Sequence, residues 1–440
     1  MKLMTAHEAV AYLPPSGRVF VQPACGLPVT LLDALADERE RFAGLELVIG
    51  LLFQPLRLLE AVPHHFRLTS LHPTAPVEPL ITAGRADYLP VRYSRIPDTF
   101  SPGGALPTDA VLVQVSPPDR HGCCSLGPAV STTVEVARRA PLVIAEINPR
   151  CPRTHGDGFL HVRDIDIAVE TDHPLVEAPP GPVGDVERAI GRHVAGLIPD
   201  GATIQVGIGA VPQAILDALA SHRDLGVHSG MLCDGMVPLV QQGVITGARK
   251  SLDPYKLAAG EAIGSQLLFE FVDDNPAVLM LPARLSHGLE YLRNQERFVS
   301  INSALEVDLS GQVNAEWLAG RQVSGLGGSF DFLEAAMYAP GGVSVVALPA
   351  TAAGGRASRI VPALAAGAAV TAPRYAVDYV VTEFGVADLR GKTLRQRAEA
   401  LVAVAHPAFQ QDLLDALNTT TVPFPDRGEG DRAPRGSRAG

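Results

Sequence analysis

The residues GRVFVQPACGLPVTLLDALA at positions 17–36 recur, altered but without a gap, as GATIQVGIGAVPQAILDALA at positions 201–220. Both stretches run from a glycine through a short apolar segment, a turn and a proline into an amphipathic segment that ends in Leu-Asp-Ala-Leu-Ala. The apolar segment has the length of a buried strand, and the last segment has the spacing of a helix. The chain is therefore predicted to carry one strand–turn–helix unit twice, at the start of two similar α/β halves. A site between such halves is the first place to look for function.

Other short apolar runs, bounded by turn residues, extend this pattern in both halves. Uninterrupted apolar strands are typical of a parallel sheet that is covered on both faces. The fold is therefore predicted to be α/β, with two similar domains and mainly parallel sheets. Weaker sequence similarity, called the weaker echoes below, relates residues 110–115 to 304–309 and residues 142–148 to 379–385. We expect strands at residues 19–22, 45–49, 110–115, 142–147, 203–206, 277–281, 344–348 and 379–381.

The length of the chain, 440 residues, favours two domains over a single core. The segment EAPPGPVG at 177–184 is the best linker, because its prolines and glycines interrupt any helix or strand. We expect an N-terminal domain over residues 1–180 and a C-terminal domain over 185–421. Residues 422–440 are rich in Arg, Asp, Gly and Pro, and are predicted to be disordered.

Composition narrows the function classes. An apolar fraction of 47% and a charged fraction of 19% are those of a soluble globular protein. We expect no membrane span and no signal peptide, because no apolar run is long enough and the N-terminus lacks a basic segment before an apolar one. The net charge of −11 argues against nucleic-acid partners. The odd number of cysteines, five, fits a reducing cytoplasm.

A cluster of glycines at residues 320–331, GRQVSGLGGSFD, is the densest candidate for a ligand site. Glycines let a backbone approach a ligand closely and present N–H groups to an anion or a carbonyl oxygen. The alternative is a flexible surface turn, and the apolar helical pattern that follows favours the ligand loop. The cluster is neither a dinucleotide fingerprint nor a P-loop.

Other candidates are weaker. Gly207 and Gly209 stand between a strand and a helix, where backbone donors gather at the helix N-terminus. Ser358 and Arg359 follow a strand and a turn, where a guanidinium can hold phosphate or carboxylate. A solvated turn is an equally good interpretation of that second segment. No metal-ligand spacing and no nucleophile elbow are present, so a metal site and a serine hydrolase are disfavoured.

Several long motifs together resemble the acetyl-CoA hydrolase/transferase family. The resemblance implies an active site between two CoA-transferase-like domains. We also expect a homodimer. The resemblance also implies that acyl-CoA, and so coenzyme A, is a substrate, with a small carboxylate or another acyl acceptor as the partner. No metal is implied. The loop implied to line the thioester is residues 324–328, of which we expect Gly325 and Gly327 to act in catalysis. The candidate substrate- or CoA-binding residues are Gly207, Gly209, Ser324, Gly328, Ser358 and Arg359. The motifs are VSPPDRHG at 115–122, PRTHGD at 152–157, GIGAVP at 207–212, SINSALEVD at 300–308, SGLGG at 324–328, ASRIVP at 357–362 and VVTEFG at 380–385.

One position departs from the family pattern. The family carries its catalytic glutamate after His-Ser or His-Thr and shortly before Asp-Gly, whereas this chain reads HSGMLCDG at 228–235, with Gly230 at that place. The glutamate attacks the thioester and carries CoA as a covalent intermediate, which glycine cannot do. Asp234, Glu316 and Cys233 are candidate replacements. The alternatives are direct attack on a bound thioester by water or a co-substrate, and CoA-ester binding without turnover.

Overall fold

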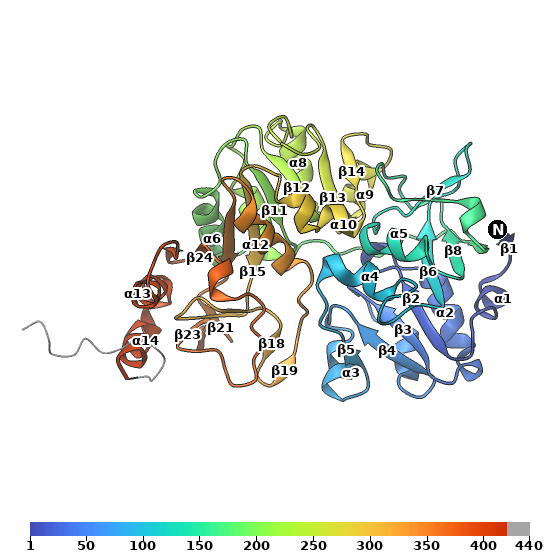
Figure 1. Ribbon diagram of the computed structural model, residues 1–440, viewed down its shortest axis with the longest axis horizontal. Helices are drawn as coiled ribbons and strands as arrows, with labels where there is room; N and C mark the ends of the chain where they lie inside the picture. Colours follow the sequence, from blue (N-terminus) through green and yellow to red (C-terminus); the bar gives the residue numbers. More distant parts are fainter. Residues whose placement is uncertain (420–440) are drawn as a thin grey trace, which may run out of the picture.

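The computed structural model describes residues 1–419 and contains two eight-stranded sheets. The first follows the order β1-β10-β8-β6-β2-β3-β4-β5, and all its pairings are parallel. The second follows the order β14-β13-β12-β11-β15-β20-β24-β25 and is parallel except for its last pair. Figure 1 shows the two halves side by side, with the N-terminal half on the right. The predicted α/β fold with mainly parallel sheets is confirmed.

The strands of the two large sheets come from separate stretches of the chain. The first sheet consists of β1 Lys2–Leu3, β2 Gly17–Val21, β3 Leu45–Ile49, β4 Phe66–Ser70, β5 Asp87–Tyr88, β6 Ala110–Val115, β8 Val143–Ile147 and β10 Ile167–Glu170. The second consists of β11 Thr203–Val206, β12 Gly226–Leu232, β13 Leu257–Ala262, β14 Val278–Met280, β15 Phe298–Ser303, β20 Val343–Ala347, β24 Tyr379–Thr382 and β25 Gly385–Asp388.

The two copies of the repeat occupy equivalent places. Strands β2 and β11 are the points at which the strand order reverses, and the two sheet orders match when one is read backwards. The weaker echoes do not match this symmetry. The counterpart of β6 is β15, because residues 304–309 have already left the large sheet, and the counterpart of β8 is β20 rather than β24.

Short strands and helices complete the architecture. The smaller sheets are formed by β7 Cys123–Ser125 with β9 Phe159–His161, by β16 Glu306–Asp308 with β17 Val313–Asn314 and β23 Ile360–Val361, by β18 Trp317–Leu318 with β19 Arg321–Gln322, and by β21 Thr351–Ala352 with β22 Ala357–Ser358. The α-helices are α1 Ala6–Val10, α2 Val29–Asp37, α3 Glu78–Thr82, α4 Ile96–Phe100, α5 Ser131–Ala137, α6 Asp185–Ala195, α7 Ala210–Asp217, α8 Met236–Gln241, α9 Gln266–Val272, α10 Ala283–Ser286, α11 Leu289–Leu292, α12 Ser329–Tyr338, α13 Leu394–Val404 and α14 Pro407–Thr419. The 3₁₀ turns are η1 Ala24–Gly26, η2 Arg39–Arg41, η3 Arg57–Ala61, η4 Tyr93–Arg95, η5 Val162–Asp164 and η6 Arg374–Ala376.

Alternation along β2 explains why the first sheet is covered on both faces. Val19 and Val21 pack with Leu31 of α2 in one apolar cluster, whereas Phe20 belongs to another cluster with Val134 of α5. Successive side chains of a strand point to opposite faces, so an all-apolar strand needs a layer on each side. The second of these clusters also contains residues of the other half, so one apolar core joins the two halves.

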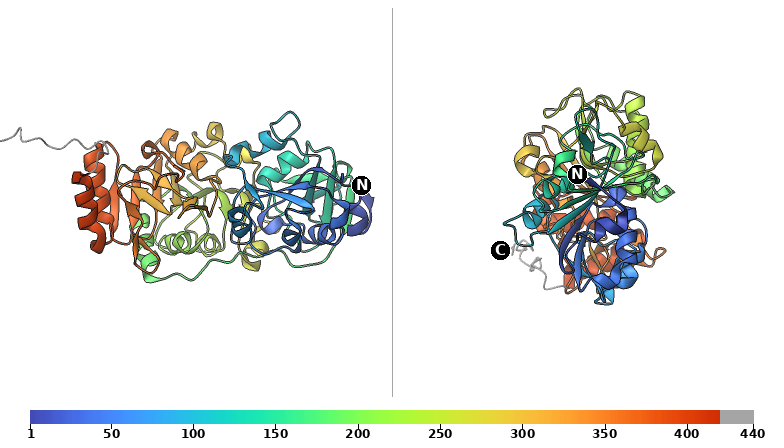
Figure 2. Two further views of the ribbon diagram at one scale, coloured as in Figure 1. Left: turned by 90° about the horizontal axis from the view of Figure 1, so that it is seen from below. Right: turned by 90° about the vertical axis from the view of Figure 1, so that its right-hand side faces the viewer.

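Helices α13 and α14 pack at the end of the molecule far from the N-terminus (Figure 2). The domain boundaries at residues 180 and 185 stay predictions, and the expected disordered tail at 422–440 lies outside the described residues. Within residues 1–419, no helix has the length and apolar character needed to cross a bilayer.

Candidate functional site

A cavity of about 360 Å³ lies between the carboxyl ends of the two sheets. Its size is within the range of small-molecule sites. One wall comes from the turns that follow β2, β3 and β4, and the opposite wall comes from the last residues of β11, β12, β13 and β15. In doubly wound sheets, ligands bind outside the carboxyl ends of strands where the strand order reverses. This central cavity therefore occupies the place at which both halves of the repeat favour a ligand.

The five residues 324–328, called the glycine loop below, all line the central cavity. Gly327 adopts a φ of +52°, and a Cβ there would lie 3.2 Å from the His72 ring. At Gly325 a Cβ would lie 3.1 Å from the Cα of His72, and at Gly328 it would collide with the ring of His287. The loop is therefore glycine-rich because its backbone passes close to both histidines.

Gly230, on β12, also lines the central cavity. A Cβ at this position would lie 2.9 Å from Nε2 of His287 and 3.2 Å from Cε2 of Phe332. The His287 ring cannot easily move aside, because its centroid lies 4.3 Å from that of the Tyr93 ring and 4.7 Å from that of the Phe332 ring. His287 thus occupies the space into which a larger side chain at position 230 would extend.

The imidazole of His287 is neutral and oriented. Burial lowers its pKa to about 3. Its Nδ1 lies 2.9 Å from the hydroxyl of Ser286, which itself donates to the carbonyl of Pro282. In the tautomer that satisfies both contacts, Nδ1–H donates to the Ser286 hydroxyl and Nε2 is the acceptor beside Gly230. An unprotonated nitrogen at this place can accept a proton from water or from a co-substrate.

Glu261, on β13, is a cavity residue that the sequence did not single out. Its side chain is 3% exposed, and its Oε1 accepts hydrogen bonds from the hydroxyls of Tyr93 at 2.8 Å and Ser131 at 2.9 Å. Its Oε2 is buried without any hydrogen-bond partner. Burial raises the pKa of Glu261 to about 8. A glutamate inside the small-residue run LAAGEAIG was a usable signal, because buried glutamates are rare unless they are paired.

The three candidate replacements for the missing glutamate do not line the central cavity. Both carboxylate oxygens of Glu316 accept hydrogen bonds, among them one from Tyr88 at 2.9 Å. Asp234 accepts from the backbone N–H of Ser265 at 3.0 Å. Burial raises the pKa of Cys233 to about 12, so its thiolate is scarce at neutral pH. Glu316 and Asp234 are thus held by hydrogen bonds within the protein, and Cys233 lines a separate cavity.

The other predicted site residues divide between two places. Gly207 lines both the central cavity and a second cavity of about 340 Å³, and Gly209 lines only the second. Gly209 is the N-cap of α7, and its φ of +116° requires a glycine. Ser358 and Arg359 line neither cavity. Arg359 instead donates to the carbonyl of Ala304, 3.3 Å away, and so supports the cavity wall from behind.

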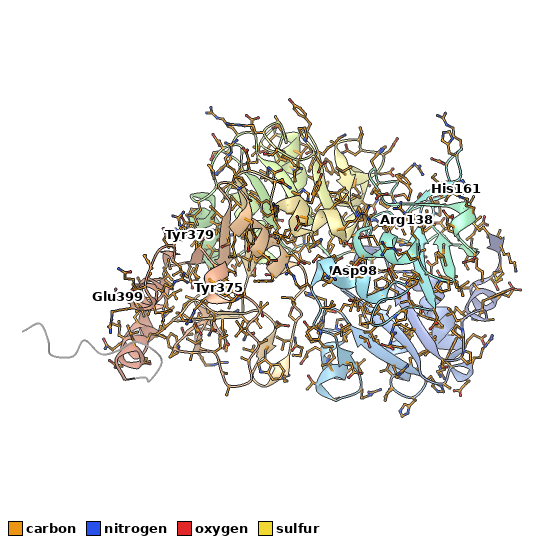
Figure 3. All side chains as sticks on the ribbon, viewed as in Figure 1. Asp98, Arg138, His161, Tyr375, Tyr379 and Glu399 are labelled. Atoms are coloured by element: carbon orange, nitrogen blue, oxygen red, sulfur yellow. The ribbon has the colours of Figure 1, made fainter. Side chains whose placement is uncertain are left out.

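Ion pairs join the two halves around the cavity. Nε of Arg92 lies 2.8 Å from Oδ1 of Asp331, a buried residue of α12 directly after the glycine loop. Arg284 of α10 bonds Glu135 and Asp157 of the N-terminal half, and Asp157 also pairs with Arg138, which is labelled in Figure 3. These contacts fix the two walls relative to each other, which a site built from both halves requires.

Comparisons with known proteins agree with this architecture. Residues 1–178 match the acetyl-CoA hydrolase/transferase N-terminal domain, and residues 264–417 match the C-terminal domain of the same family. The chain is 44% identical to 4-hydroxybutyrate coenzyme A transferase of Clostridium kluyveri over 94% of this chain and 96% of that protein. It is 34% identical to butyryl-CoA:acetate CoA-transferase of Anaerostipes caccae, covering 94% and 95% of the two chains.

Solved structures give the same result. The crystal structure of RipA from Yersinia pestis matches with a TM-score of 0.89 at 32% identity, covering 94% of this chain and 96% of that chain. The crystal structure of 4-hydroxybutyrate CoA-transferase from Porphyromonas gingivalis matches with a TM-score of 0.79 at 36% identity and the same coverage.

Proposed function

The chain belongs to the acetyl-CoA hydrolase/transferase family, and we propose that its central cavity binds an acyl-CoA thioester and passes CoA or the acyl group to an acceptor. The acceptor is a small carboxylate or another acyl acceptor. The observation that carries the proposal is the meeting of the glycine loop, Gly230 and the carboxyl ends of both sheets at one cavity. Relatives named for 4-hydroxybutyrate and for acetate as CoA-transferase substrates support carboxylate acceptors.

The roles of the loop residues follow from backbone chemistry. Gly325, Gly327 and Gly328 let the loop approach the thioester, and the N–H groups of these three glycines donate to the charge that develops on the carbonyl oxygen. One such donor is typically worth roughly 10²–10³ in rate. Gly207 lines both cavities and Gly209 lines the second one, at the N-terminus of α7, and we assign this second cavity to another part of the CoA molecule. Arg359 acts on this site only through the wall that it supports.

Position 230 carries no covalent chemistry, because glycine offers no carboxylate. An adduct at this position is therefore not expected in any step. A second function, hydrolysis of the thioester, is favoured by the free Nε2 of His287 beside Gly230, because this nitrogen can accept the proton of an attacking water. The third possibility is CoA-ester binding without turnover. The homodimer and the cytoplasmic location stay predictions.

One experiment separates these functions. The protein is incubated with a panel of acyl-CoAs, each alone and with acetate, butyrate, succinate or a primary amine, and product masses are recorded. Transfer gives a new acyl-CoA or a new amide only when the acceptor is present, whereas hydrolysis gives free CoA in its absence. Calorimetric titration with the same acyl-CoAs measures binding. Binding without any product identifies a CoA-ester-binding protein, and no binding of any acyl-CoA contradicts the proposal as a whole.

A further inference from the structure

The central cavity has one acidic side chain in its wall among residues 1–419, and it is Glu261. This carboxyl group has the burial of a core residue and one oxygen without a partner. Leaving a buried polar atom unsatisfied costs free energy, typically as much as a hydrogen bond contributes or more. The group is therefore not explained as a structural hydrogen-bonding residue, because such a residue would have both of its oxygens bonded.

Glu261 stands close to position 230 but approaches the cavity differently. It lies on β13, next to β12, and it pairs with Met231, the residue after Gly230. Neighbouring strands are about 4.8 Å apart, and successive side chains leave a strand on opposite faces. A carboxylate at 261 therefore comes from the other face of the sheet than a side chain at 230. Both reach the cavity because the cavity lies beyond the carboxyl ends of the strands, and both residues line it.

The space at position 230 is filled at the same time. The His287 ring lies where a glutamate at 230 would begin, and Phe332 closes the same space. A carboxylate on β12 and the present position of His287 exclude each other, whereas a carboxylate on β13 is compatible with it.

We propose that Glu261 is the nucleophile of this site and carries out, from β13, the covalent step for which position 230 has no side chain. This inference rests on the proposed function, since it requires an acyl-CoA in the central cavity. In this scheme a covalent route takes the place of direct attack on the bound thioester. The route uses Glu261 and not position 230, where the family pattern places the nucleophile.

The step balances without any further reactant. Oε2 of ionised Glu261 attacks the thioester carbonyl carbon and the C–S bond breaks. CoA leaves as thiolate, and a mixed anhydride of Glu261 and the acyl group remains. The thiolate attacks the glutamyl carbonyl carbon, the acyl group leaves as its carboxylate, and a glutamyl–CoA thioester remains. An acceptor carboxylate then attacks that thioester and expels CoA thiolate, giving a second anhydride. Attack by the thiolate on the acceptor's acyl carbon releases the new acyl-CoA and restores Glu261.

The hydrogen bonds on the other oxygen fit this role. Tyr93 and Ser131 both donate to Oε1, which holds the carboxylate plane and leaves Oε2 as the free atom. The ionised form is the nucleophile, and the raised pKa of Glu261 means that this form increases with pH through about 8. Tyr93 and Ser131 act as positioning residues in this scheme.

The test is to look for the glutamyl–CoA thioester on the wild-type protein. The protein is incubated with the acyl-CoA that binds best, treated with borohydride or hydroxylamine, and analysed by intact and peptide mass spectrometry. We expect the modified residue to map to Glu261. The Glu261→Gln variant keeps an Oε1 acceptor for Tyr93 and Ser131, and its CoA exchange should fall by at least about 1,000-fold, the scale on which loss of a covalent nucleophile acts in other enzymes. Glu270→Gln, an exposed residue on α9, is the matched control and should keep wild-type exchange.

The outcomes separate this inference from the proposed function. Acyl-CoA binding with an adduct at another carboxylate, or with exchange that survives in Glu261→Gln, overturns the role of Glu261 and leaves the proposed function intact. Turnover without any adduct in the wild-type protein also overturns it and supports direct attack. Absence of acyl-CoA binding contradicts the proposed function itself.

Discussion

Placing a methyl group at position 230 tests whether His287 is the reason for glycine there. The φ of Gly230 is not in the left-handed region, so an alanine backbone is tolerated. The new Cβ would lie 2.9 Å from Nε2 of His287 and 3.2 Å from Cε2 of Phe332, both closer than the usual contact of about 3.5–4.0 Å. The ring must shift by about half an ångström against Tyr93 and Ser286. Overpacking of this kind costs roughly 1–3 kcal/mol, and we expect Gly230→Ala to lower the free energy of unfolding by that amount.

The assay is a double-mutant cycle in urea with Gly230→Ala, His287→Ala and the combination of the two. Removing the His287 ring opens the space that the Cβ needs, so the cost of Gly230→Ala should fall to near zero in the His287→Ala background. Contacting residues typically show coupling energies of about 0.5–3 kcal/mol. Gly207→Ala is the matched control, because a Cβ there meets nothing within 4 Å and the residue lines the same cavity.

Two results would refute this reasoning. One is an unchanged stability of Gly230→Ala, and the other is a cost that persists undiminished without His287. In the Glu261→Gln background, the same geometry predicts that adding Gly230→Glu alone restores no carboxylate-dependent CoA exchange, whereas adding Gly230→Glu together with His287→Ala restores it. Product masses from acyl-CoA and acetate measure that recovery, and exchange by the Glu261→Gln, Gly230→Glu variant that keeps His287 would contradict the steric argument.

Three further predictions concern the loop, the buried acid and the contact between the halves. Gly327→Val should abolish acyl-CoA binding in calorimetry while the circular dichroism spectrum stays native. The φ of +52° at this position disfavours valine, and the new side chain would meet His72. Unchanged affinity in the folded variant contradicts the loop assignment. The stability of the wild type relative to Glu261→Gln should fall as the pH rises from about 4.5 to about 8 and then level off. Burial raises the pKa of Glu261 from 4.5 to about 8, so the folded protein holds this proton more tightly than the unfolded chain does. The stabilisation that results is complete below pH 4.5 and is lost as the pH rises to about 8. Its neighbours do not titrate in this window, because burial lowers the pKa of His287 to about 3, raises that of Cys25 to about 12 and raises that of Tyr93 well above its usual value. Thermal midpoints at several pH values decide, and parallel curves for the two proteins would show that folding does not raise the pKa of Glu261. Arg92→Ala should lower the free energy of unfolding by roughly 3 kcal/mol, because it leaves the buried Asp331 carboxylate without its cation. The control Arg95→Ala removes only an exposed ion pair with Asp98, and it should lower the free energy of unfolding by less than about 1 kcal/mol. Equal effects of the two arginine variants in urea unfolding would contradict the importance of the contact between the halves.

The repeat was sufficient to predict two parallel sheets because it carries its own local signals. An apolar run, a turn and an amphipathic helix specify a strand–turn–helix unit wherever they occur, and two copies specify two sheets. Strands β12 and β13 were not predicted, because GVHSGML and LAAGEA contain glycine and polar residues. Their strand conformation depends on neighbours on both sides in the sheet, and a single sequence does not reveal those neighbours.

The contrast between local sequence signals and contacts made only in the fold also decides which site residues the sequence could predict. The glycine loop was found because four glycines in nine residues are visible without a structure, and its residues 324–328 do line the cavity. Glu261 and His287 belong to no motif, and they meet the cavity only because β13 lies beside β12 and α10 packs against the strand ends. The resemblance predicted that Gly230 stands at the place of the family glutamate, and of the three candidate replacements only Asp234 and Cys233 are near it along the chain. Neither of these two lines the central cavity, whereas Glu261 is 31 positions from Gly230 and belongs to the adjacent strand.

Glycine at position 230 could be a sign that catalysis has been lost, but the surroundings of this residue argue against that interpretation. A cavity free of catalytic demands would gain stability by exchanging Glu261 for an apolar side chain, since a buried carboxyl group with an unpartnered oxygen lowers stability. Sites at which the local rules of stability are broken, with strongly shifted pKa values in a cavity, are typically functional sites. Here the costly acid, the neutral imidazole held by Ser286 and the glycine that makes room for it all meet in one place. Random decay after loss of a nucleophile has no reason to place an orphaned carboxyl group on the neighbouring strand of the same cavity. A change in the direction from which the carboxylate approaches the thioester explains all three residues together.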